Sequence, residues 1–330
     1  MDLNSIMKEI VIIDGHTDIP RDVYLRESKG EKDVFMSKHY KELRDAGVNI
    51  VFANIFTKTF PEAALKEALL QIEKALKVTK ENEDVILIKS KKDLDDVLTN
   101  NKLGLVLSLE GFEPLGNSPE LLNIFYELGI RAGMLTWNYT NAFASGADVM
   151  NGQLSEKGIS AINIMNSLGI LIDVSHLNEQ GFWDIVKHNK NKPIIASHSN
   201  ARALFNHSRN LTDEQIKAIA ESGGVVGAVS YFSKVDENDL NKIRTDDDNT
   251  ETIHDYIKHI EYLVNLVGYD HVSFGFDFNM YLGDFGVAGL ENASKIKDVI
   301  QLLLERNHKL EDVKKIAGGN LIRVLYDILE

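Results

Sequence analysis

The chain contains no cysteine among its 330 residues. This absence excludes disulfide bonds, thiolate metal sites and a cysteine nucleophile, and it agrees with a reducing compartment. The chain also has no long apolar run: its first nine residues lack the apolar core of a signal peptide, and no window approaches the length of a membrane span. We therefore expect a cytoplasmic protein with no membrane partner.

Basic residues are fewer than acidic residues. The sequence has 36 Lys and Arg against 50 Asp and Glu, which gives a formal net charge of -14. An excess of acid repels both a nucleic-acid backbone and an anionic membrane surface, and no basic stripe offsets it. We therefore expect neither as a partner. Apolar residues at 44% and charged residues at 26% are ordinary for a globular protein with a large core.

Eight short apolar runs, most of them separated by segments with helical periodicity, indicate parallel βαβ units. Eight is the number at which such a sheet closes on itself, and a closed barrel of this kind takes about 250 residues or more. We predict one (β/α)8 TIM-type barrel with extra helices, which occupies residues 1–330 as a single domain. The expected strands are residues 10–13, 47–56, 104–111, 130–137, 169–176, 193–198, 224–230 and 271–277, with a short strand at 85–88 outside the main sheet.

An open, doubly wound sheet is the alternative. It is disfavoured because the first strand lacks the glycine fingerprint of a dinucleotide site, and because polar residues end many strands rather than cluster at one switch point. We expect helices at 62–82, from Ser118 to about Leu128, from a capping box at Thr212 and at 253–267. Residues 21–40 and 234–252 are expected to be mainly loop, and Gly318-Gly319 to break the last two helices.

Six polar residues end five of the predicted strands. In a barrel these ends converge on one face, where the active sites of this fold lie. Each residue alone is more often a satisfied polar group than a ligand, but the joint occurrence is not expected by chance. Three imidazoles and three carboxylates are too many for one tetrahedral zinc, and two metals that share a bridging carboxylate account for the number. The set is His16, Asp18, Glu110, His176, His198 and Asp277.

The other seven histidines fall in predicted loops, in helices or at the opposite strand ends. We interpret them as structural or solvated. They are His39, His188, His207, His254, His259, His271 and His308.

Several short strings, in order along nearly the whole chain, resemble the membrane (renal) dipeptidase family of zinc peptidases, which belongs with the amidohydrolase-type barrels. The absence of a secretion signal, cysteines and a lipid-anchor tail makes the chain similar to a cytoplasmic, prokaryote-like member. The strings are Asp-Gly-His-Thr-Asp at 14–18, Glu110-Gly111, Asp-Val-Ser-His at 173–176, Ser-His-Ser at 197–199, Ser-Arg-Asn-Leu at 208–211, Gly-Phe-Asp-Phe at 275–278 and Gly-Gly-Asn-Leu at 318–321.

The resemblance implies two zinc ions bridged by Glu110, although other divalent metals are compatible with these ligands. One ion is held by His16 and Asp18 and the other by His176 and His198. It implies that a hydroxide activated by both metals attacks the amide carbonyl of a small dipeptide. It also suggests a homodimer.

Two further residues receive roles from the resemblance. Asp277 is expected to handle protons beside the metals, and Arg209 to bind the terminal carboxylate of the substrate, as a guanidinium can do with two parallel hydrogen bonds. Two alternatives stay open. Arg202 competes with Arg209, and Asp277 could instead be a structural partner of a histidine ligand.

The chain departs from the family after strand four. Mammalian members carry a histidine there that helps to hold the substrate carbonyl, whereas this chain has Trp137, which offers one indole donor and a large apolar face. Either the metals polarise the carbonyl without help, or Asn138 or Tyr139 substitutes, or the substrate differs. Trp137 and Asn138 are therefore predicted to line the substrate site.

Three hypotheses follow. The first is a metal-dependent dipeptidase, and the second keeps the same site for N-acyl amino acids, cyclic amides or lactones. The third is a non-catalytic barrel that binds a phosphorylated ligand or a partner. It is disfavoured because residues 231–237 are acidic rather than glycine-rich, although Gly283, Gly286 and Gly289 leave some room for it.

Overall fold

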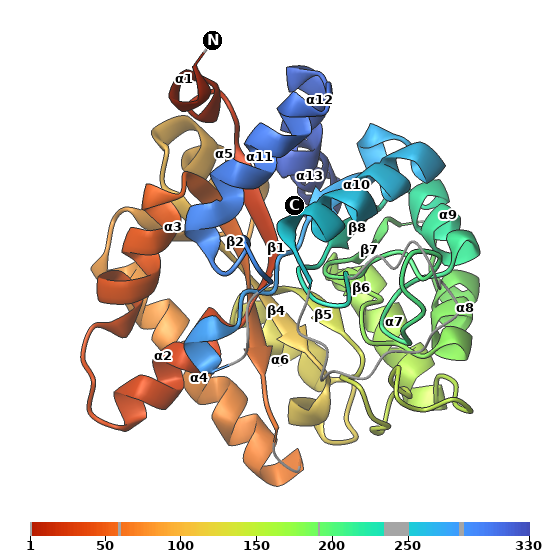
Figure 1. Cartoon of the computed structure of the whole chain (residues 1–330). Helices are drawn as coiled ribbons and strands as arrows, with labels where there is room; N and C mark the ends of the chain where they lie inside the picture. Colours follow the sequence, from red (N-terminus) through yellow and green to blue (C-terminus); the bar gives the residue numbers. More distant parts are fainter. Residues whose placement is uncertain (1, 59–60, 191, 234–250, 284–286) are drawn as a thin grey trace.

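A parallel sheet rolled into a barrel forms the centre of the computed structural model, which describes residues 2–58, 61–190, 192–233, 251–283 and 287–330 (Figure 1). The sheet order is β1-β2-β4-β5-β6-β7-β8-β9, and β3 pairs with β4 only. The fold is a (β/α)8 TIM-type barrel. Its strands are β1 (Ile12–Thr17), β2 (Val48–Phe56), β3 (Val85–Leu87), β4 (Leu103–Glu110), β5 (Ile130–Met134), β6 (Leu171–Asp173), β7 (Ile194–Ala196), β8 (Val225–Ala228) and β9 (Val272–Phe274).

Helices surround the strands on the outside (Figure 1). None of those in the described ranges is both long enough and apolar enough to cross a bilayer. They are α1 (Leu3–Met7), α2 (Ile19–Ser28), α3 (Lys41–Asp45), α4 (Pro61–Glu81), α5 (Lys91–Asn100), α6 (Leu121–Glu127), α7 (Glu156–Leu168), α8 (Glu179–His188), α9 (Asp213–Glu221), α10 (Ile253–Val267), α11 (Ile296–Glu305), α12 (Leu310–Lys314) and α13 (Asn320–Ile328). Short turns of π-helix are η1 (Phe35–Tyr40) and η6 (Lys315–Gly319), and short 3-10 turns are η2 (Glu113–Leu115), η3 (Tyr269–His271), η4 (Met280–Leu282) and η5 (Ala293–Lys295).

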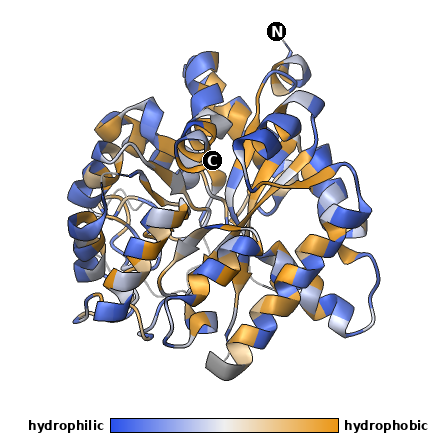
Figure 2. Ribbon diagram, turned by 180° about the vertical axis from the view of Figure 1, so that it is seen from behind, coloured by the Kyte–Doolittle hydropathy of each residue, from blue (hydrophilic) through white to orange (hydrophobic). Residues whose placement is uncertain are grey.

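The strands are buried on both faces, which is why they appear in the sequence as nearly continuous apolar runs. In β2, Ile50 and Phe52 belong to a cluster inside the barrel, whereas Val51 and Ala53 belong to the cluster between the strands and the helices. This alternation follows from the two-residue period of a strand. Figure 2 shows the same arrangement, with apolar strands at the centre and helices whose outward faces are hydrophilic.

The two ends of the barrel differ. Side chains of α13, among them Leu321 and Leu325, join the interior cluster with Ile13 and Leu171 from the first halves of their strands. The amino-terminal end of the barrel is therefore filled with apolar side chains. The other end of the barrel, at the carboxyl ends of the strands, carries the polar residues that the sequence singled out. This end is therefore the one available for chemistry.

The seam between β1 and β9 is closed by a side chain. Oδ1 of the buried Asp14 accepts the backbone N–H of Phe276 at 2.9 Å and that of His16 at 3.2 Å. The next residue, Gly15, lies against the backbone of neighbouring strands: a Cβ there would come within 2.9 Å of the Phe274 carbonyl oxygen. A carboxylate and a glycine thus hold the strand that carries His16 in place.

Most expected elements are present and a few differ. The strand predicted at 85–88, the capping box at Thr212 and the helix over 253–267 are confirmed. The expectation of loop after residue 21 is wrong, because α2 begins at Ile19; its weak amphipathicity hid it from a periodicity argument. The helix expected from Ser118 begins only at Leu121. Most of the polar stretch 234–252 lies outside the described residues.

Gly318-Gly319 does not break the last two helices, as was expected, but continues them through the π-helical turn η6. A Cβ on Gly318 would meet the Val11 carbonyl oxygen at 2.4 Å. Glycine is needed here for a close approach of helix to strand rather than for termination.

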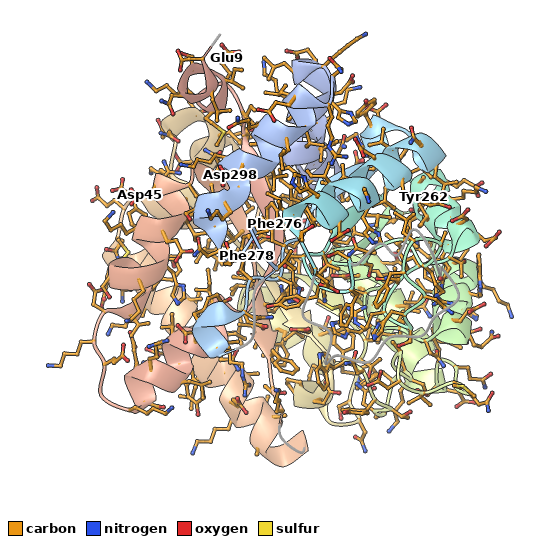
Figure 3. All side chains as sticks on the ribbon, in the orientation of Figure 1. Glu9, Asp45, Tyr262, Phe276, Phe278 and Asp298 are labelled. Carbon is orange, nitrogen blue, oxygen red and sulfur yellow. The ribbon has the colours of Figure 1, made fainter. Side chains whose placement is uncertain are left out.

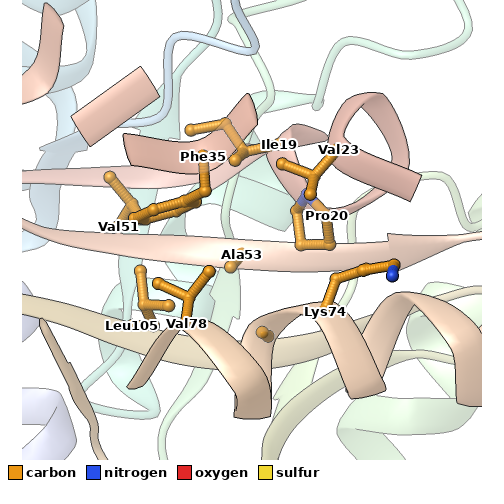
Figure 4. Close-up of a pocket in the computed structure, with 10 residues that line it drawn as sticks. Ile19, Pro20, Val23, Phe35, Val51, Ala53, Lys74, Val78 and Leu105 are labelled. Carbon is orange, nitrogen blue, oxygen red and sulfur yellow. The ribbon is translucent and has the colours of Figure 1, made fainter. Parts of the chain in front are cut away.

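A small apolar cavity lies between α2, α4 and the outer face of β2 (Figure 4). Val51 and Ala53, which line it, point away from the barrel interior. The ammonium of Lys74 forms ion pairs with Glu27 and Glu73, both at 3.2 Å. The cavity is a gap in the packing of the outer layer, and the strand wall separates it from the polar residues at the strand ends.

Candidate active site

The six polar residues predicted at the strand ends come together in the structure. His16 is the second-last residue of β1, and Glu110 is the final residue of β4. His176, His198 and Asp277 lie two or three residues after the ends of β6, β7 and β9. Asp18 is the residue before α2, and its carboxylate makes no capping hydrogen bond to that helix, so it is free to face the centre.

Glu110 stands in the middle of the group. Its Oε2 lies 3.5 Å from Nε2 of His16, and its Oε1 lies 3.0 Å from Nε2 of His176. Nε2 of His176 is 2.8 Å from Nε2 of His198, and Nε2 of His16 is 3.6 Å from Oδ1 of Asp277. One carboxylate therefore reaches two separate sets of nitrogen and oxygen donors.

Three overlapping groups have ligand atoms within 4.8 Å of one another and could each hold a metal ion. All their members except Asp277 are buried, and Asp277 has a side chain that is 17% exposed. The groups are His16, Asp18 and Glu110; Glu110, His176 and His198; and His16, His198 and Asp277.

The donor atoms fit a cation. Nε2 of His16, Oδ1 of Asp18 and Oε2 of Glu110 are buried without a hydrogen-bond partner among the described residues. Leaving buried polar atoms unsatisfied costs about 1–3 kcal/mol each, so native structures rarely do it without a ligand. Nitrogen and carboxylate oxygen suit zinc and related divalent ions.

Hydrogen bonds on the far side of two rings fix their tautomers. Nδ1 of His176 contacts Oδ1 of Asn138 at 2.7 Å, and because that oxygen can only accept, Nδ1 carries the hydrogen. Nδ1 of His198 lies 2.8 Å from the hydroxyl of Ser197, which can accept from it in the same way. The two Nε2 atoms then face each other with lone pairs, an arrangement that a shared cation stabilises.

His16 has a comparable partner in Asn54, whose amide lies 2.9 Å from Nδ1 of the ring. The Asn54 oxygen is buried without a partner. Turning the amide by 180° places that oxygen on Nδ1 and leaves Nε2 of His16 as the atom that binds a cation. Sequence reasoning missed Asn54 and Ser197; the only signal was a polar residue within an apolar strand run.

A second buried carboxylate, Asp173, links the ends of β6 and β7, as Asp14 links β1 to the segment after β9. Its Oδ1 accepts the backbone N–H groups of Ser175 at 3.0 Å and Ser197 at 3.1 Å. Neither Asp14 nor Asp173 received a role of its own from the sequence. Asp14 lies two residues before His16, and Asp173 lies three residues before His176. Both carboxylates accept hydrogen bonds from backbone N–H groups, and neither belongs to a ligand group of the described residues.

Two site residues have strained backbones. The φ angles of His176 and Asp277 are +71° and +57°, in the left-handed region that non-glycine residues rarely adopt. Asp277 is flanked by Phe276 and Phe278, whose rings stack 4.8 Å apart and lie at the centre of the molecule in Figure 3. The Asn279 amide also donates to Oδ1 of Asp277 at 2.7 Å, so packing and a hydrogen bond hold the strained turn.

Burial controls the ionisation of the site. It raises the pKa of Asp18 and of Glu110 to about 8, and the pKa of Asp277 to about 7. It also holds the pKa values of His176 and His198 well below the usual range of histidine. The site thus collects neutral imidazoles and carboxylates that repel one another, and a divalent cation would restore their ordinary ionisation.

The guanidinium of Arg209 reaches this group from the loop after β7. It is buried, burial lowers its pKa to about 10, and its side chain donates to the His198 carbonyl oxygen at 3.4 Å. Its backbone N–H donates to His207, whose ring stacks on Phe232 at 4.1 Å. The competing candidate, Arg202, instead binds the Asn210 carbonyl oxygen and Glu179.

Trp137 lies on the rim beside His176, with 6.1 Å between the ring centroids. Phe56 and Tyr139 pack on the indole at 5.2 and 5.5 Å. The ammonium of Lys58 lies 5.9 Å from the Trp137 centroid. The indole therefore presents an apolar wall with a positive charge above it, whereas the oxygen of Asn138 is used on His176.

The other histidines stay outside the three ligand groups of the described residues. His39 contacts Asp22 at 2.8 Å, and Nδ1 of His259 accepts the backbone N–H of Ala201 at 3.2 Å. His271 and His308 contact the Gly224 carbonyl oxygen and the Tyr269 hydroxyl. These contacts agree with structural roles.

Comparisons with known proteins place the chain among peptidases. Residues 1–330 match the family model described as membrane dipeptidase (peptidase family M19). The uncharacterized dipeptidase C965.12 of Schizosaccharomyces pombe is 30% identical, with 97% of this chain and 81% of that protein covered. Dipeptidase tcpJ of Claviceps purpurea is 28% identical, with 95% and 69% covered. A metallo peptidase from Rhodobacter sphaeroides, liganded with a phosphinate mimic of L-Ala-D-Ala, shares the fold at a TM-score of 0.86 and 21% identity, with 97% and 99% covered.

We predict that the metal-free chain loses stability as the pH rises from 6.5 to 8.5. In the unfolded chain these acids are already ionised above about pH 5, whereas Asp18 and Glu110, with pKa values raised to about 8, still hold protons in the folded state. Each retained proton costs about 1.4 kcal/mol per pH unit, so the free energy of unfolding should fall by about 1–3 kcal/mol. The lowered histidine pKa values act in the opposite sense only below about pH 6.5.

Urea unfolding in the presence of a chelator at pH 6.5, 7.5 and 8.5 measures this change. The zinc-loaded protein is the control, and it should lack the loss of stability because the cation keeps the carboxylates ionised. Constant or rising stability of the chelated chain over this range would contradict the prediction.

Proposed function

The chain belongs to the membrane dipeptidase family, peptidase family M19, and is a metal-dependent dipeptidase; we propose that it works with two zinc ions on small dipeptides that have a free carboxyl terminus. The observation that carries the proposal is the position of Glu110, whose two oxygens face two different donor groups. An enzyme of this kind, rather than a non-catalytic barrel, agrees with the family.

The described residues suit two ions rather than one. Glu110, His16 and Asp18 would hold the first, and Glu110, His176 and His198 would hold the second. Asn54, Ser197 and Asn138 are proposed to orient the three rings through their Nδ1 atoms. Such supporting hydrogen bonds usually matter for metal affinity nearly as much as the ligands themselves.

A pair of divalent cations, when bound, lowers the pKa of water and polarises a carbonyl, which makes amide hydrolysis feasible near neutral pH. Asp277 is proposed to take the proton from the attacking water and pass it to the leaving amine. Its Oδ1 lies 3.6 Å from Nε2 of His16, and Asp277 is in neither of the two proposed ligand sets, so its carboxylate is placed to exchange a proton beside them. Its contact with Asn279 keeps the carboxylate oriented while it does so.

Arg209 is proposed to bind the terminal carboxylate of the substrate. Among the described residues, one of the five donors of this buried guanidinium contacts a carbonyl oxygen, at 3.4 Å, which leaves capacity for a planar anion. Trp137, whose ring centroid lies 6.1 Å from that of His176, is proposed to line the pocket for the acyl residue. The oxygen of Asn138 serves His176, so a substrate contact of Asn138 would have to come from its amide nitrogen.

N-acyl amino acids are the second candidate substrate class. The observation that favours them is Lys58, whose ammonium above Trp137 and Phe56 would repel a free amino group on the acyl residue. A matched panel decides between the classes: free dipeptides should have the higher kcat/KM, whereas higher values for their N-acetylated forms would favour the second candidate.

Elemental analysis is expected to find about two zinc ions per chain, as in other two-metal hydrolases. Glu110→Gln should lose most of the bound metal and the dipeptidase activity together, because the amide no longer supplies two negative oxygens. Glu113→Gln is the matched control: this carboxylate binds Asn141 at 3.1 Å and belongs to none of the ligand groups. Full activity of purified, metal-free protein would contradict the proposal.

Arg209→Met is expected to raise the KM for dipeptides about 10- to 100-fold, because a charge-assisted pair with the carboxylate is lost. The same variant should barely change the KM for the corresponding dipeptide amides, which have no terminal carboxylate. Arg202→Met serves as the control and should behave as wild type. Equal losses for acids and amides in steady-state assays would remove the carboxylate-binding role.

A further inference from the structure

A tyrosine outside the predicted site contacts the backbone of a candidate ligand. The hydroxyl of Tyr281, in η4, accepts the backbone N–H of Asp18 at 3.1 Å, although the two residues lie 263 positions apart in the sequence. Tyr281 belongs to none of the ligand groups. Its contact is with the backbone of Asp18, so it acts on where that residue sits rather than on its charge.

Asp18 needs such a contact. It precedes the first residue of α2, where backbone N–H groups have no partner within the helix, and its own carboxylate does not cap them. That carboxylate is left free to face His16 and Glu110, with Oδ1 buried and unpartnered. A hydrogen bond from outside the helix is therefore what holds the residue at the point where strand β1 becomes α2.

The phenol is held in turn by a closed ring of contacts. The Arg26 guanidinium donates to the Tyr281 carbonyl oxygen at 3.1 Å and to Oδ1 of Asp22 at 2.8 Å. Nε2 of His39 lies 2.8 Å from Oδ2 of Asp22, and its ring packs edge-on against Tyr281 at 5.0 Å. The ring of contacts thus returns to the residue from which it began.

The geometry of α2 explains why these residues can cooperate. Asp22 and Arg26 follow Asp18 by four and eight residues, so they lie on the same face of the helix. His39 comes from the π-helical turn η1, and such turns are frequent at functional sites. One helix therefore carries both a candidate ligand and the two residues that fix its support.

We propose that Tyr281 is a positioning residue of the metal centre, which holds Asp18 so that the half of the centre formed by His16, Asp18 and Glu110 retains its ion. The inference rests on the proposed two-metal function. The phenol is neutral in this role, since burial keeps its pKa well above 10.

Tyr281→Phe tests the proposal, because phenylalanine keeps the ring on His39 and removes only the hydroxyl. Zinc binding is measured by competition with a chromophoric chelator on the full chain. We expect the affinity for one of the two ions to fall about 10- to 100-fold, as is usual for residues that support a ligand, with the other affinity nearly unchanged. Excess zinc should restore the kcat of the variant to near the wild-type value.

Tyr262→Phe is the matched control. Its hydroxyl donates to Asp213 at 2.9 Å between two outer helices, away from the strand ends (Figure 3). It should leave both zinc affinities unchanged. Unchanged affinities in Tyr281→Phe, or an equal loss of both ions, would overturn the inference while the two-metal function stands. A wild-type chain that binds fewer than two ions would instead count against the function itself.

Discussion

The burial of donor atoms that lack a hydrogen-bond partner among the described residues is the constraint on which the rest of this structure depends. Asp18 and Glu110 are buried with oxygens that find no hydrogen-bond partner among the described residues, and His16 has an unpartnered nitrogen in the same space. Groups of this kind would move apart or find water if the backbone allowed it. The fold keeps them together, and bound divalent metal would make that arrangement favourable.

The backbone is prevented from relaxing by buried carboxylates that are not ligands. Asp14 joins β1 to the segment after β9, and Asp173 joins the ends of β6 and β7. With these strand ends fixed, His176 and Asp277 can be held at positive φ angles. The cost of that strain is about 1–3 kcal/mol for each residue, and the large apolar core can supply it.

Two groups of side chains around the centre are suited to bind different parts of a substrate. Arg209, on the loop after β7, offers a buried positive charge that suits a carboxylate. Trp137 and Phe56 form an apolar wall on the side of β2 and β5, with Lys58 above it. A buried positive charge and an apolar wall beside the same centre suit a substrate that is acidic at one end, as the proposed activity requires.

Sequence reasoning could identify the barrel and the residues at its rim because both have local signals. Apolar runs mark the strands, and a histidine or carboxylate that ends such a run is visible without coordinates, as at Glu110 and His198. It missed α2, whose charged residues give a weak period. It also could not find Asn54 or the role of Gly318, because each depends on a neighbour far away in the chain.

The order of strands and the identity of the donor residues were thus determined by the sequence itself, since each follows from the pattern of a few consecutive side chains. Only the tertiary structure decided that the Tyr281 hydroxyl meets the backbone of Asp18, that Arg209 rather than Arg202 reaches the centre, and that Asn138 turns its oxygen to His176. The reason is physical: such contacts are made by side chains whose positions are set by the packing of separate loops, and no local pattern records that packing.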